Sequence, residues 1–229
     1  MTIDEIMQRL ATLDTPTVSD ALDRLDCPGA VLGVHGLSGG SRISGRVVTV
    51  ELGPPDAGPP APSGQPPSTP ARHLGTAAVE ASGPGDVIVV ANGGRTEVAG
   101  WGGVLSLAAH LRGVEGVLVD GAVRDVDDAV RLSFPVYARR AVPRTARGRV
   151  VEHSWNEPIR FADIAVSPGD LVIADRSGVV FVQRVAAVDV LRVAGEIAAH
   201  ESAMVRRLYA GEPVSQVMGA HYEELLEDR

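Results

Sequence analysis

Two turns of sequence Pro-Gly-Asp, each followed at once by four apolar residues, constrain the fold more than any other feature of the chain. One turn, at residues 84–86, leads into Val87–Val90, and the other, at residues 168–170, leads into Leu171–Ala174. A continuous apolar run after such a turn is typical of a strand that is covered on both faces. Helical segments lie between strands of this kind, so we expect a mixed α/β fold.

The remaining elements follow from the spacing of apolar residues. Short runs rich in β-branched residues predict further strands, and three- to four-residue periodicity predicts helices. The predicted strands are residues 46–52, 87–90, 117–119, 136–138, 171–174 and 179–182, and the predicted helices are residues 3–13, 18–22 (capped by Thr17), 74–81, 100–112, 125–132, 185–209 (ending at Gly211) and 221–227. We therefore expect a single domain over residues 1–229, with a C-terminal helical extension over residues 185–229.

Residues 54–70 interrupt this pattern, because they contain 8 of the 16 prolines of the chain. Proline lacks a backbone N–H, so such a stretch cannot form a regular set of backbone hydrogen bonds or bury a core. We interpret it as an exposed loop. A polyproline ligand for a recognition module is the alternative.

Charge and cysteine content exclude several classes of function. The chain has 21 Lys and Arg against 29 Asp and Glu, a formal net charge of −8, which disfavours a broad nucleic-acid-binding face. The single cysteine, Cys27, cannot form an internal disulfide or a cysteine metal cluster. No apolar run approaches the roughly 18 residues of a membrane span, and residues 1–4 do not begin a signal peptide. We expect a cytoplasmic protein that binds neither nucleic acid nor membranes.

A glycine pair followed by a helix is the first candidate for chemistry. Trp101-Gly102-Gly103 precedes the apolar helical run that begins with Val104 and Leu105. Glycine lets a ligand approach the free amides at a helix N-terminus, where the helix dipole favours a carboxylate or a phosphate.

The second candidate is the charged segment Asp120–Asp128, which follows a buried strand, so we expect its charges to project from the end of that strand. Arg124 can hold a carboxylate through two parallel hydrogen bonds. Asp125 and Asp128 are three residues apart and share a helical face. Their hard oxygen atoms suit Mg²⁺ or Mn²⁺.

Structural roles explain the same residues without any chemistry. In this reading Asp125 simply caps a helix, and Arg124 forms a surface ion pair with Asp120 or Asp128. Gly102-Gly103 is then no more than a tight turn. Two other kinds of site motif are absent from the sequence. The six histidines show no paired metal-ligand spacing, and no Gly-x-x-x-x-Gly-Lys phosphate-binding loop occurs.

Several ordered motifs together resemble one protein family, from about residue 10 to about residue 212. The chain resembles the 4-hydroxy-4-methyl-2-oxoglutarate aldolases and the RraA-like regulators of ribonuclease activity. The motifs that carry the resemblance are Thr17–Leu22, Pro84–Val90, Trp101–Gly103, Val119–Asp125, Phe134–Arg139, Val166–Asp175 and Gly178–Val180.

The resemblance implies a β/β/α swivelling-type domain with helical N- and C-terminal extensions. It also implies assembly as a homotrimer or as a hexamer of two stacked trimers, with sites between subunits. In the aldolase members, the arginine that matches Arg124 binds the pyruvyl carboxylate and enolate. The aspartate that matches Asp125 holds a divalent metal largely through waters.

Two further sets of residues have roles that only the resemblance implies. The backbone amides of Gly103, Val104 and Leu105 are expected to cradle the substrate. Glu201 is the match, by approximate position, to a glutamate on the C-terminal helix of a neighbouring subunit that contacts the metal waters.

One position departs from the aldolase pattern. The aldolases tend to carry an aspartate twenty-one residues before the arginine, where this chain has Gly103, as in the regulator-like branch. That aspartate would help a metal-bound water to remove the proton from the substrate hydroxyl, and Asp128 is a candidate substitute. Decarboxylation of a 2-oxo diacid such as oxaloacetate needs no such base, only a metal and an arginine that stabilise the enolate.

We therefore expect a class II, metal-dependent carbon–carbon lyase, either a pyruvate aldolase or an oxaloacetate decarboxylase. It would release pyruvate from a small carboxylated 2-oxo acid with Mg²⁺ or Mn²⁺, through Arg124, Asp125 and Asp128. One alternative is a non-catalytic regulator that binds a ribonuclease or another protein. Another, suggested by the proline-rich residues 54–70, is a specialised lyase or isomerase of a biosynthetic pathway.

Overall fold

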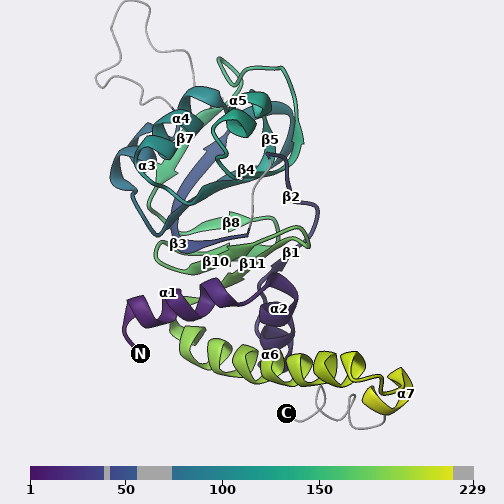
Figure 1. Ribbon diagram of the computed structural model, residues 1–229. Helices are drawn as coiled ribbons and strands as arrows, with labels where there is room; N and C mark the ends of the chain where they lie inside the picture. Colours follow the sequence, from purple (N-terminus) through teal and green to yellow (C-terminus); the bar gives the residue numbers. More distant parts are fainter. Residues whose placement is uncertain (39–41, 56–73, 219–229) are drawn as a thin grey trace, which may run out of the picture.

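A nine-stranded mixed sheet runs through the computed structural model, which describes residues 1–38, 42–55 and 74–218 (Figure 1). Its strands are β1 (Ala30–Val31), β2 (His35–Gly36), β3 (Ile43–Gly53), β4 (Asp86–Trp101), β5 (Gly116–Val123), β6 (Val136–Ala141), β7 (Val151–Trp155), β10 (Leu171–Ala174) and β11 (Val179–Val182). The order across the sheet is β1-β11-β10-β3-β4-β5-β6-β2, and β7 pairs with the last residues of β3.

The four central strands β3, β4, β5 and β6 are parallel, whereas the outer strands pair antiparallel. Parallel neighbours need a crossover connection, and three helices of the described chain lie within these connections. They are α3 (Thr76–Ala81), α4 (Gly103–Leu111) and α5 (Val126–Arg131). Figure 1 shows all three at the same end of the molecule, so they cover one face of the central sheet.

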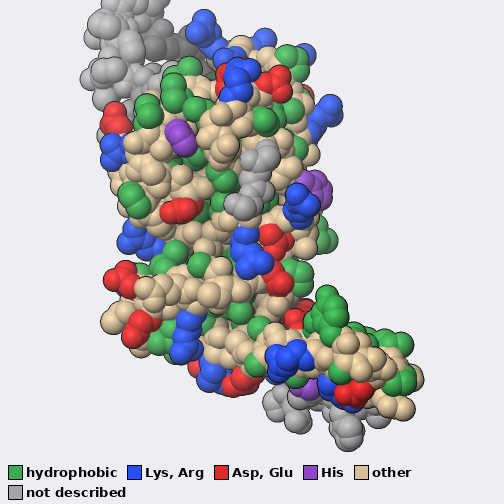
Figure 2. Space-filling view, viewed as in Figure 1, with side chains coloured by type: hydrophobic (Ala, Val, Ile, Leu, Met, Phe, Trp, Pro, Cys, Tyr) green, Lys and Arg blue, Asp and Glu red, His purple; other side chains and the backbone are tan. Residues whose placement is uncertain are grey.

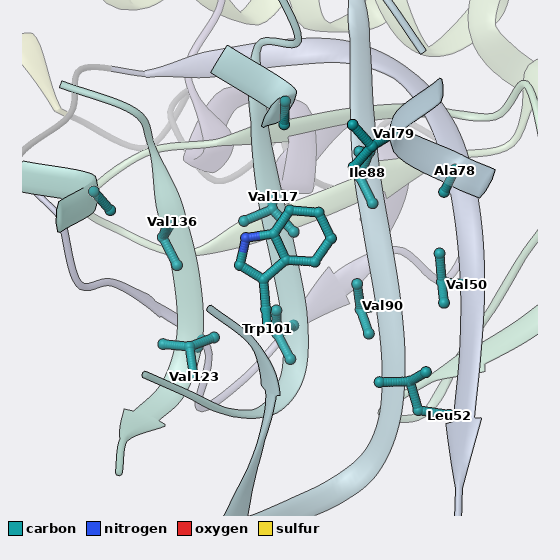
Figure 3. Packing of buried hydrophobic residues seen from close by; sticks show 14 of the residues in the cluster. Val50, Leu52, Ala78, Val79, Ile88, Val90, Trp101, Val117, Val123 and Val136 are labelled. Carbon is teal, nitrogen blue, oxygen red and sulfur yellow. The ribbon is translucent and has the colours of Figure 1, made fainter. Parts of the chain in front are cut away.

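The apolar run of strand β4 is continuous rather than alternating because residues on both of its faces pack into a core. Ile88 and Val90 pack into the core beneath α3, α4 and α5, while Val87 and Val89 pack into a second core on the other face. In the first core, Figure 3 shows the indole of Trp101 among aliphatic side chains of β4 and β5. The second core includes Phe161 of the hairpin formed by β8 (Ile159–Phe161) and β9 (Ile164–Val166). Both faces of β4 are therefore buried.

A third core joins the two ends of the chain to strands β10 and β11. Helices α1 (Ile3–Thr12), α2 (Thr15–Arg24) and α6 (Ala187–Tyr209) contribute Leu10, Leu22 and Leu191, which pack with Ile173. The short helices η1 (Arg184–Ala186) and α7 (Val214–Val217) flank α6. The mixed α/β class with helical N- and C-terminal ends is thus confirmed. None of the helices in the described ranges combines the length and hydrophobicity that a bilayer crossing requires.

The structure corrects the predicted start of the second helix. Asp14, not Thr17, is the N-cap of α2, and its Oδ1 accepts hydrogen bonds from both the amide (3.0 Å) and the hydroxyl (2.6 Å) of Thr17. Both residue types are good N-caps. Thr17 is the third residue of the helix, and it donates hydrogen bonds to the cap instead of serving as the cap.

Strands β3, β4, β5 and β6 are longer than predicted, and the extensions of β4 and β5 bear on the candidate site. Strand β4 continues past Val90 to Trp101, through Gly93 and Gly94 with φ of +58° and +69°, and its register against β5 shifts three times. Strand β5 continues to Val123, so Asp120 lies inside a buried strand rather than at its end. The predicted helix over 221–227 and most of the proline-rich stretch, from residue 56 onward, fall outside the described residues.

Asp175 fastens the start of α2 to the end of strand β10. Its carboxylate accepts hydrogen bonds from the Thr15 amide (2.9 Å), the Thr15 hydroxyl (2.6 Å) and the Ser177 amide (2.8 Å). Burial raises the pKa of Asp175, but these hydrogen bonds and the charge of Arg42 outweigh it, so the pKa lies below its ordinary value of 3.8.

We predict that Asp175→Ala lowers the free energy of unfolding at pH 7 by about 1.5–3 kcal/mol, the typical contribution of hydrogen bonds to a charged group. A carboxylate whose pKa is depressed by folding stabilises the native state above the unfolded-state pKa, and this contribution disappears as the pH falls through the native pKa. The difference between wild type and variant should therefore shrink below about pH 4. Urea unfolding over a pH series measures it, with Glu80→Ala as an exposed control. An undiminished difference at acid pH would contradict this account.

Candidate functional site

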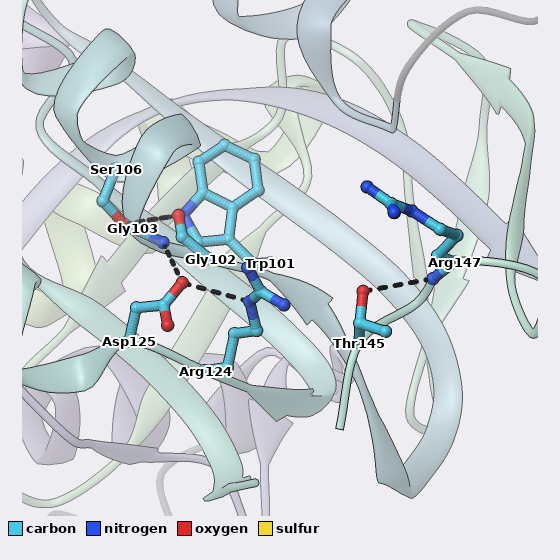
Figure 4. A network of polar contacts seen from close by, with 8 residues as sticks. All are labelled: Trp101, Gly102, Gly103, Ser106, Arg124, Asp125, Thr145 and Arg147. Atoms are coloured by element: carbon cyan, nitrogen blue, oxygen red, sulfur yellow. Dashed lines mark hydrogen bonds and ion pairs between the residues drawn. The ribbon is translucent and has the colours of Figure 1, made fainter. Parts of the chain in front are cut away.

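The end of strand β5 and the starts of helices α4 and α5 meet at one point of the structure (Figure 4). Trp101 and Val123 are partners in neighbouring strands, and the Arg124 amide donates to the Trp101 carbonyl at 3.0 Å. Residues that follow the two strands, Gly102 and Gly103 after β4 and Arg124 and Asp125 after β5, are thereby adjacent. The two segments that sequence analysis singled out form a single site.

The Asp125 carboxylate is the centre of this site. Its Oδ2 accepts a hydrogen bond from the Gly103 amide at 3.0 Å and pairs with Arg124 Nε at 3.1 Å. Gly103 is the first residue of α4, where the amide has no intrahelical partner and the helix dipole favours negative charge. The carboxylate therefore compensates both the α4 N-terminus and the Arg124 guanidinium. Both side chains reach solvent.

The backbone around Asp125 is unusual for a residue other than glycine. Asp125 has φ +57° and ψ +38°, the left-handed region that aspartate and asparagine tolerate better than most residues. It occupies the N-cap position of α5, which was the structural alternative for this residue, but its side chain makes no capping hydrogen bond to α5. Its carboxylate instead accepts the amide of Gly103, the first residue of α4.

The core holds the glycine pair in place. The Trp101 indole Nε1 donates to Ser106 Oγ at 2.9 Å, and Ser106 Oγ donates to the Gly102 carbonyl at 3.3 Å. Because Trp101 and Ser106 are both buried, these bonds anchor the start of α4 to the core beneath it. Sequence analysis did not identify Ser106 as part of the site.

Carboxylates lie close to both glycines, where a side chain would meet them. A Cβ atom on Gly103 would lie 2.5 Å from Asp128 Oδ2 and 3.0 Å from the Asp125 Cβ, and one on Gly102 would lie 3.1 Å from Asp125 Oδ2. Each distance is shorter than an ordinary van der Waals contact. The pair is therefore more than a tight turn, because its missing side chains leave the space in which Asp125 and Asp128 come together.

Arg124 does not form the ion pair with Asp120 or Asp128 that the structural alternative suggested. Asp120 pairs with Arg139 at 2.6 Å, and Asp128 pairs with Arg131, so neither carboxylate pairs with Arg124. Arg124 pairs with its own neighbour Asp125. Its Nε makes that contact, so the two terminal nitrogen atoms of the guanidinium are directed elsewhere.

The helix amides divide into two groups. The Gly103 amide is already engaged by Asp125, whereas no side chain of the described residues caps the amides of Val104 and Leu105. Early amides of a helix lack intrahelical acceptors. Val104 is 83% exposed, so its backbone is close to solvent. These two amides are available to an anionic ligand beside Arg124.

Glu201 lies far from this site within one chain. It belongs to α6, which Figure 1 shows at the opposite end of the molecule from α4 and α5. Burial raises its pKa, the charges of Asp14 and Asp20 raise it further, and His200 lowers it. A contact between Glu201 and the metal waters therefore needs a neighbouring subunit, as the family resemblance implied, and stays a prediction.

An arginine-rich segment also borders the site. Residues 139–149 include five arginines, and the Val142 amide donates to the Val123 carbonyl at 2.8 Å, directly before Arg124. Figure 4 shows Arg147 and Thr145 of this segment in the same view, joined by a hydrogen bond from the Arg147 amide to Thr145 Oγ1. Sequence analysis missed this segment, although the density of arginines was a signal for a ligand of negative charge.

Comparison with known proteins shows similarity over most of the chain. The sequence model of the RraA-like family, described as Aldolase/RraA, matches residues 15–181. A relative from Halalkalibacterium halodurans, named as a 4-hydroxy-4-methyl-2-oxoglutarate aldolase, is 31% identical over 211 residues, which cover 90% of this chain and 89% of the relative. A relative from Methanocaldococcus jannaschii is 33% identical over 58% of this chain, and the chain spans 63% of that relative's length. A relative from Legionella pneumophila is 26% identical over 79% of this chain, and the chain spans only 28% of its length.

Two solved structures share the fold. A protein of Pseudomonas syringae pv. tomato superposes with a TM-score of 0.81 at 25% identity, covering 94% of this chain and 98% of the other. The RNA-processing inhibitor RraA from Thermus thermophilis superposes with a TM-score of 0.54 at 26% identity, covering 68% and 84% of the two chains.

Three substitutions of Asp125 separate its backbone role from its charge. We predict that Asp125→Ala lowers the free energy of unfolding by about 2 kcal/mol, because it loses the cap of α4 (about 1 kcal/mol) and because alanine tolerates the left-handed region less well than aspartate (about 1 kcal/mol). Asp125→Gly should lose only the cap. Asp125→Asn, which tolerates the left-handed turn and can still accept from Gly103, should cost the least.

Urea unfolding followed by the fluorescence of the two tryptophans measures these differences. The expected order of stability is Asn above Gly above Ala. Equal stability of the alanine and asparagine variants would show that neither the cap nor the left-handed turn matters.

Proposed function

The chain belongs to the RraA-like family, and from this membership we propose that it is a metal-dependent carbon–carbon lyase that releases pyruvate from a small carboxylated 2-oxo acid. The membership agrees with the motifs from which the resemblance was drawn, and relatives in the family are named as aldolases. The observation that carries the proposal is the Asp125 carboxylate, which joins the start of α4 to the Arg124 guanidinium beside two uncapped amides.

Arg124 is the residue proposed to bind the reacting end of the substrate. Its Nε is held by Asp125, which orients the planar guanidinium and leaves the N–H groups of the terminal nitrogens for a substrate. A guanidinium can bind the carboxylate of a 2-oxo acid through parallel hydrogen bonds. The same donors stabilise the enolate oxygen, where negative charge develops as the carbon–carbon bond breaks. The amides of Val104 and Leu105 would donate further hydrogen bonds to the same carboxylate oxygens.

The carboxylates around Gly103 fit a hard divalent cation. Asp125 and Asp128 both approach the space that the missing Gly103 side chain leaves open, and carboxylate oxygens suit Mg²⁺ or Mn²⁺. Within the described residues no group of three or more potential metal-binding side chains comes together. As the family resemblance implies, Asp125 would hold the cation mainly through waters, with Glu201 of a neighbouring subunit as an outer contact. When bound, the cation would polarise the 2-oxo group.

The position of Asp128 bears on which bond is cleaved. Aldol cleavage requires a base for the substrate hydroxyl, and the aldolases place an aspartate where this chain has Gly103. Asp128 Oδ2 lies 2.5 Å from the position of a Gly103 Cβ, so its carboxylate fills part of the space of the missing aspartate. We propose Asp128 as the base for aldol cleavage. Decarboxylation of an oxaloacetate-like substrate would need only Arg124 and the cation.

Exposed apolar side chains support assembly into a homotrimer or a hexamer. Val104, Leu107 and Leu111 lie exposed on α4, beside the candidate site. Hydrophobic side chains also gather on the projecting end of α6 and on α7 (Figure 2), namely Val205, Leu208, Tyr209, Val214 and Met218. Exposed apolar groups of this kind mark protein–protein contacts. Association would allow Glu201 of one subunit to approach the Asp125 site of another.

The Gly103 position favours a second candidate, a non-catalytic regulator of a ribonuclease. Glycine at this position is the regulator-like pattern, and the RraA of Thermus thermophilis, 26% identical, is named as an inhibitor of RNA processing. Co-purification of a ribonuclease, together with no turnover of any 2-oxo acid, would favour this role over the lyase.

The lyase proposal predicts pyruvate release from oxaloacetate or from 4-hydroxy-2-oxo diacids in the presence of Mg²⁺ or Mn²⁺. EDTA should abolish the activity, and added cation should restore it. Arg124→Ala should lower kcat by about 100-fold or more, the typical cost of losing a donor to a developing oxyanion. Arg192→Gln, an exposed arginine of α6 that pairs with Glu196, is the control and should keep wild-type activity. Activity that survives both chelation and Arg124→Ala would refute the mechanism.

The role of Asp128 predicts a difference between the two reactions. Asp128→Asn should slow aldol cleavage of a 4-hydroxy-2-oxo diacid by about 100-fold or more, as expected for the loss of a general base. Decarboxylation of oxaloacetate should change far less, because it requires no base. Asp127→Asn, the neighbouring exposed aspartate on α5, is the matched control. A parallel loss of both activities in the Asp128 variant would assign Asp128 to positioning instead.

A further inference from the structure

A cavity lies apart from the site around Asp125. It has a volume of about 550 Å³ and is located where the end of β3, the middle of β4 and Asp120 of β5 face the β8–β9 hairpin. None of its lining residues belongs to the Gly103, Arg124, Asp125 and Asp128 group. Its volume falls within the range of small-molecule sites, which run from about 300 to 1,000 Å³. The roles proposed above for the lyase reaction do not use it.

Three arginines from different elements line this cavity, namely Arg95 of β4, Arg139 of β6 and Arg160 of β8. Arg95 donates one terminal nitrogen to the carbonyls of Leu52 and Asn92, at 3.4 and 2.8 Å. Among the described residues, no hydrogen bond or ion pair engages the Arg160 guanidinium. Each arginine carries five N–H donors, so Arg95 and Arg160 retain donors for a ligand.

Among the described residues, the acidic side chains of the cavity form no ion pair with Arg95 or Arg160. Asp120, 3% exposed, accepts hydrogen bonds from Arg139 Nε at 2.6 Å and from the Ala162 amide at 3.0 Å, so both of its oxygens are engaged. Glu51 and Asp163 are exposed, and within the described residues neither forms an ion pair with Arg95 or Arg160. The buried pair instead fixes Arg139 in the wall of the cavity.

A glycine pair gives access to the arginines. Gly93 and Gly94 line the cavity with φ of +58° and +69°, and a Cβ on Gly93 would lie 3.1 Å from a terminal nitrogen of Arg95. A side chain at Gly93 would therefore crowd the guanidinium of Arg95. The absence of one leaves the face of Arg95 open to a molecule inside the cavity.

We propose that this cavity binds a small organic anion, whose carboxylate or phosphate group is held by Arg95 and Arg160. Arg139, fixed by Asp120, is the third donor. An oxyanion fits forked guanidinium donors with parallel hydrogen bonds. The volume exceeds that of a single oxyanion, so the ligand carries a further organic part. This proposal is independent of the lyase activity, because it uses none of the same residues.

Titration calorimetry in the Arg124→Gln background tests the proposal, since that substitution removes the carboxylate-binding arginine of the first site. The probes are inorganic phosphate and succinate. We expect at least one of them to bind saturably, and the one that binds identifies the type of oxyanion. Adding Arg160→Gln should weaken its Kd by about tenfold or more. Arg160 is exposed and its guanidinium is unpaired among the described residues, so this variant should fold, which circular dichroism verifies.

Arg140→Gln in the same background is the matched control, because Arg140 is an exposed arginine next to Arg139 on β6 and does not line the cavity. It should leave the Kd unchanged. No saturable binding of either probe would overturn the proposal. Binding that survives Arg160→Gln, or that falls equally in the Arg140 variant, would overturn it as well. The lyase assays are unaffected by any of these results, so the two proposals can fail separately.

Discussion

One carboxylate at the N-terminus of one helix determines the geometry of the candidate site. Asp125 accepts the Gly103 amide of α4, pairs with Arg124 at the end of β5 and begins α5. Three elements are thus tied together by a single side chain. In this arrangement Asp125 has a left-handed backbone, and its carboxylate closely approaches the backbone of α4 beside Gly103. The functional proposal depends on this contact, since it orients Arg124.

The buried central strands β4 and β5 hold the contact between Asp125 and Gly103 at their ends. All eight residues of β5 are buried, so the strand is held on both faces, and the first polar residues after it emerge together at its end. The neighbouring strand β4 ends at Trp101, whose indole is bound to Ser106 inside α4. The hydrophobic layers thereby hold the polar site rigidly, even though its own side chains reach solvent.

Periodicity predicted the parts of the fold that local pattern controls. The buried strands after the two Pro-Gly turns and the long helix α6 follow from short stretches of sequence. Only the family resemblance implied that Arg124 and Asp125 act together with the glycine pair. The N-cap was misassigned to Thr17, because Asp14 and Thr17 are both good caps and only the hydrogen bond from Thr17 to Asp14 distinguishes them. The continuation of β4 beyond Val90 was missed, because glycines at 93 and 94 usually end a strand.

Other features depend on contacts between distant residues. Strands β8 and β9 have three residues each, too few to show a periodic pattern. Arg95, Arg139 and Arg160 meet at one cavity although they belong to three strands, and no spacing in the sequence announces this. That Asp120 binds Arg139 rather than Arg124 follows from the pairing of β5 with β6, which only the folded chain reveals.

Asp120 lies on the buried strand β5, and Arg124 follows directly after that strand. Asp120 lines the cavity, whereas Arg124 belongs to the site around Asp125. Adding or removing one residue between them would turn the remainder of the strand over, because successive side chains point to opposite faces. Either an aspartate would enter the aliphatic layer, or the guanidinium would leave the start of α4. Natural variants of this protein should accordingly change length in outlying segments such as α7, while the ten residues from Gly116 to Asp125 keep their number.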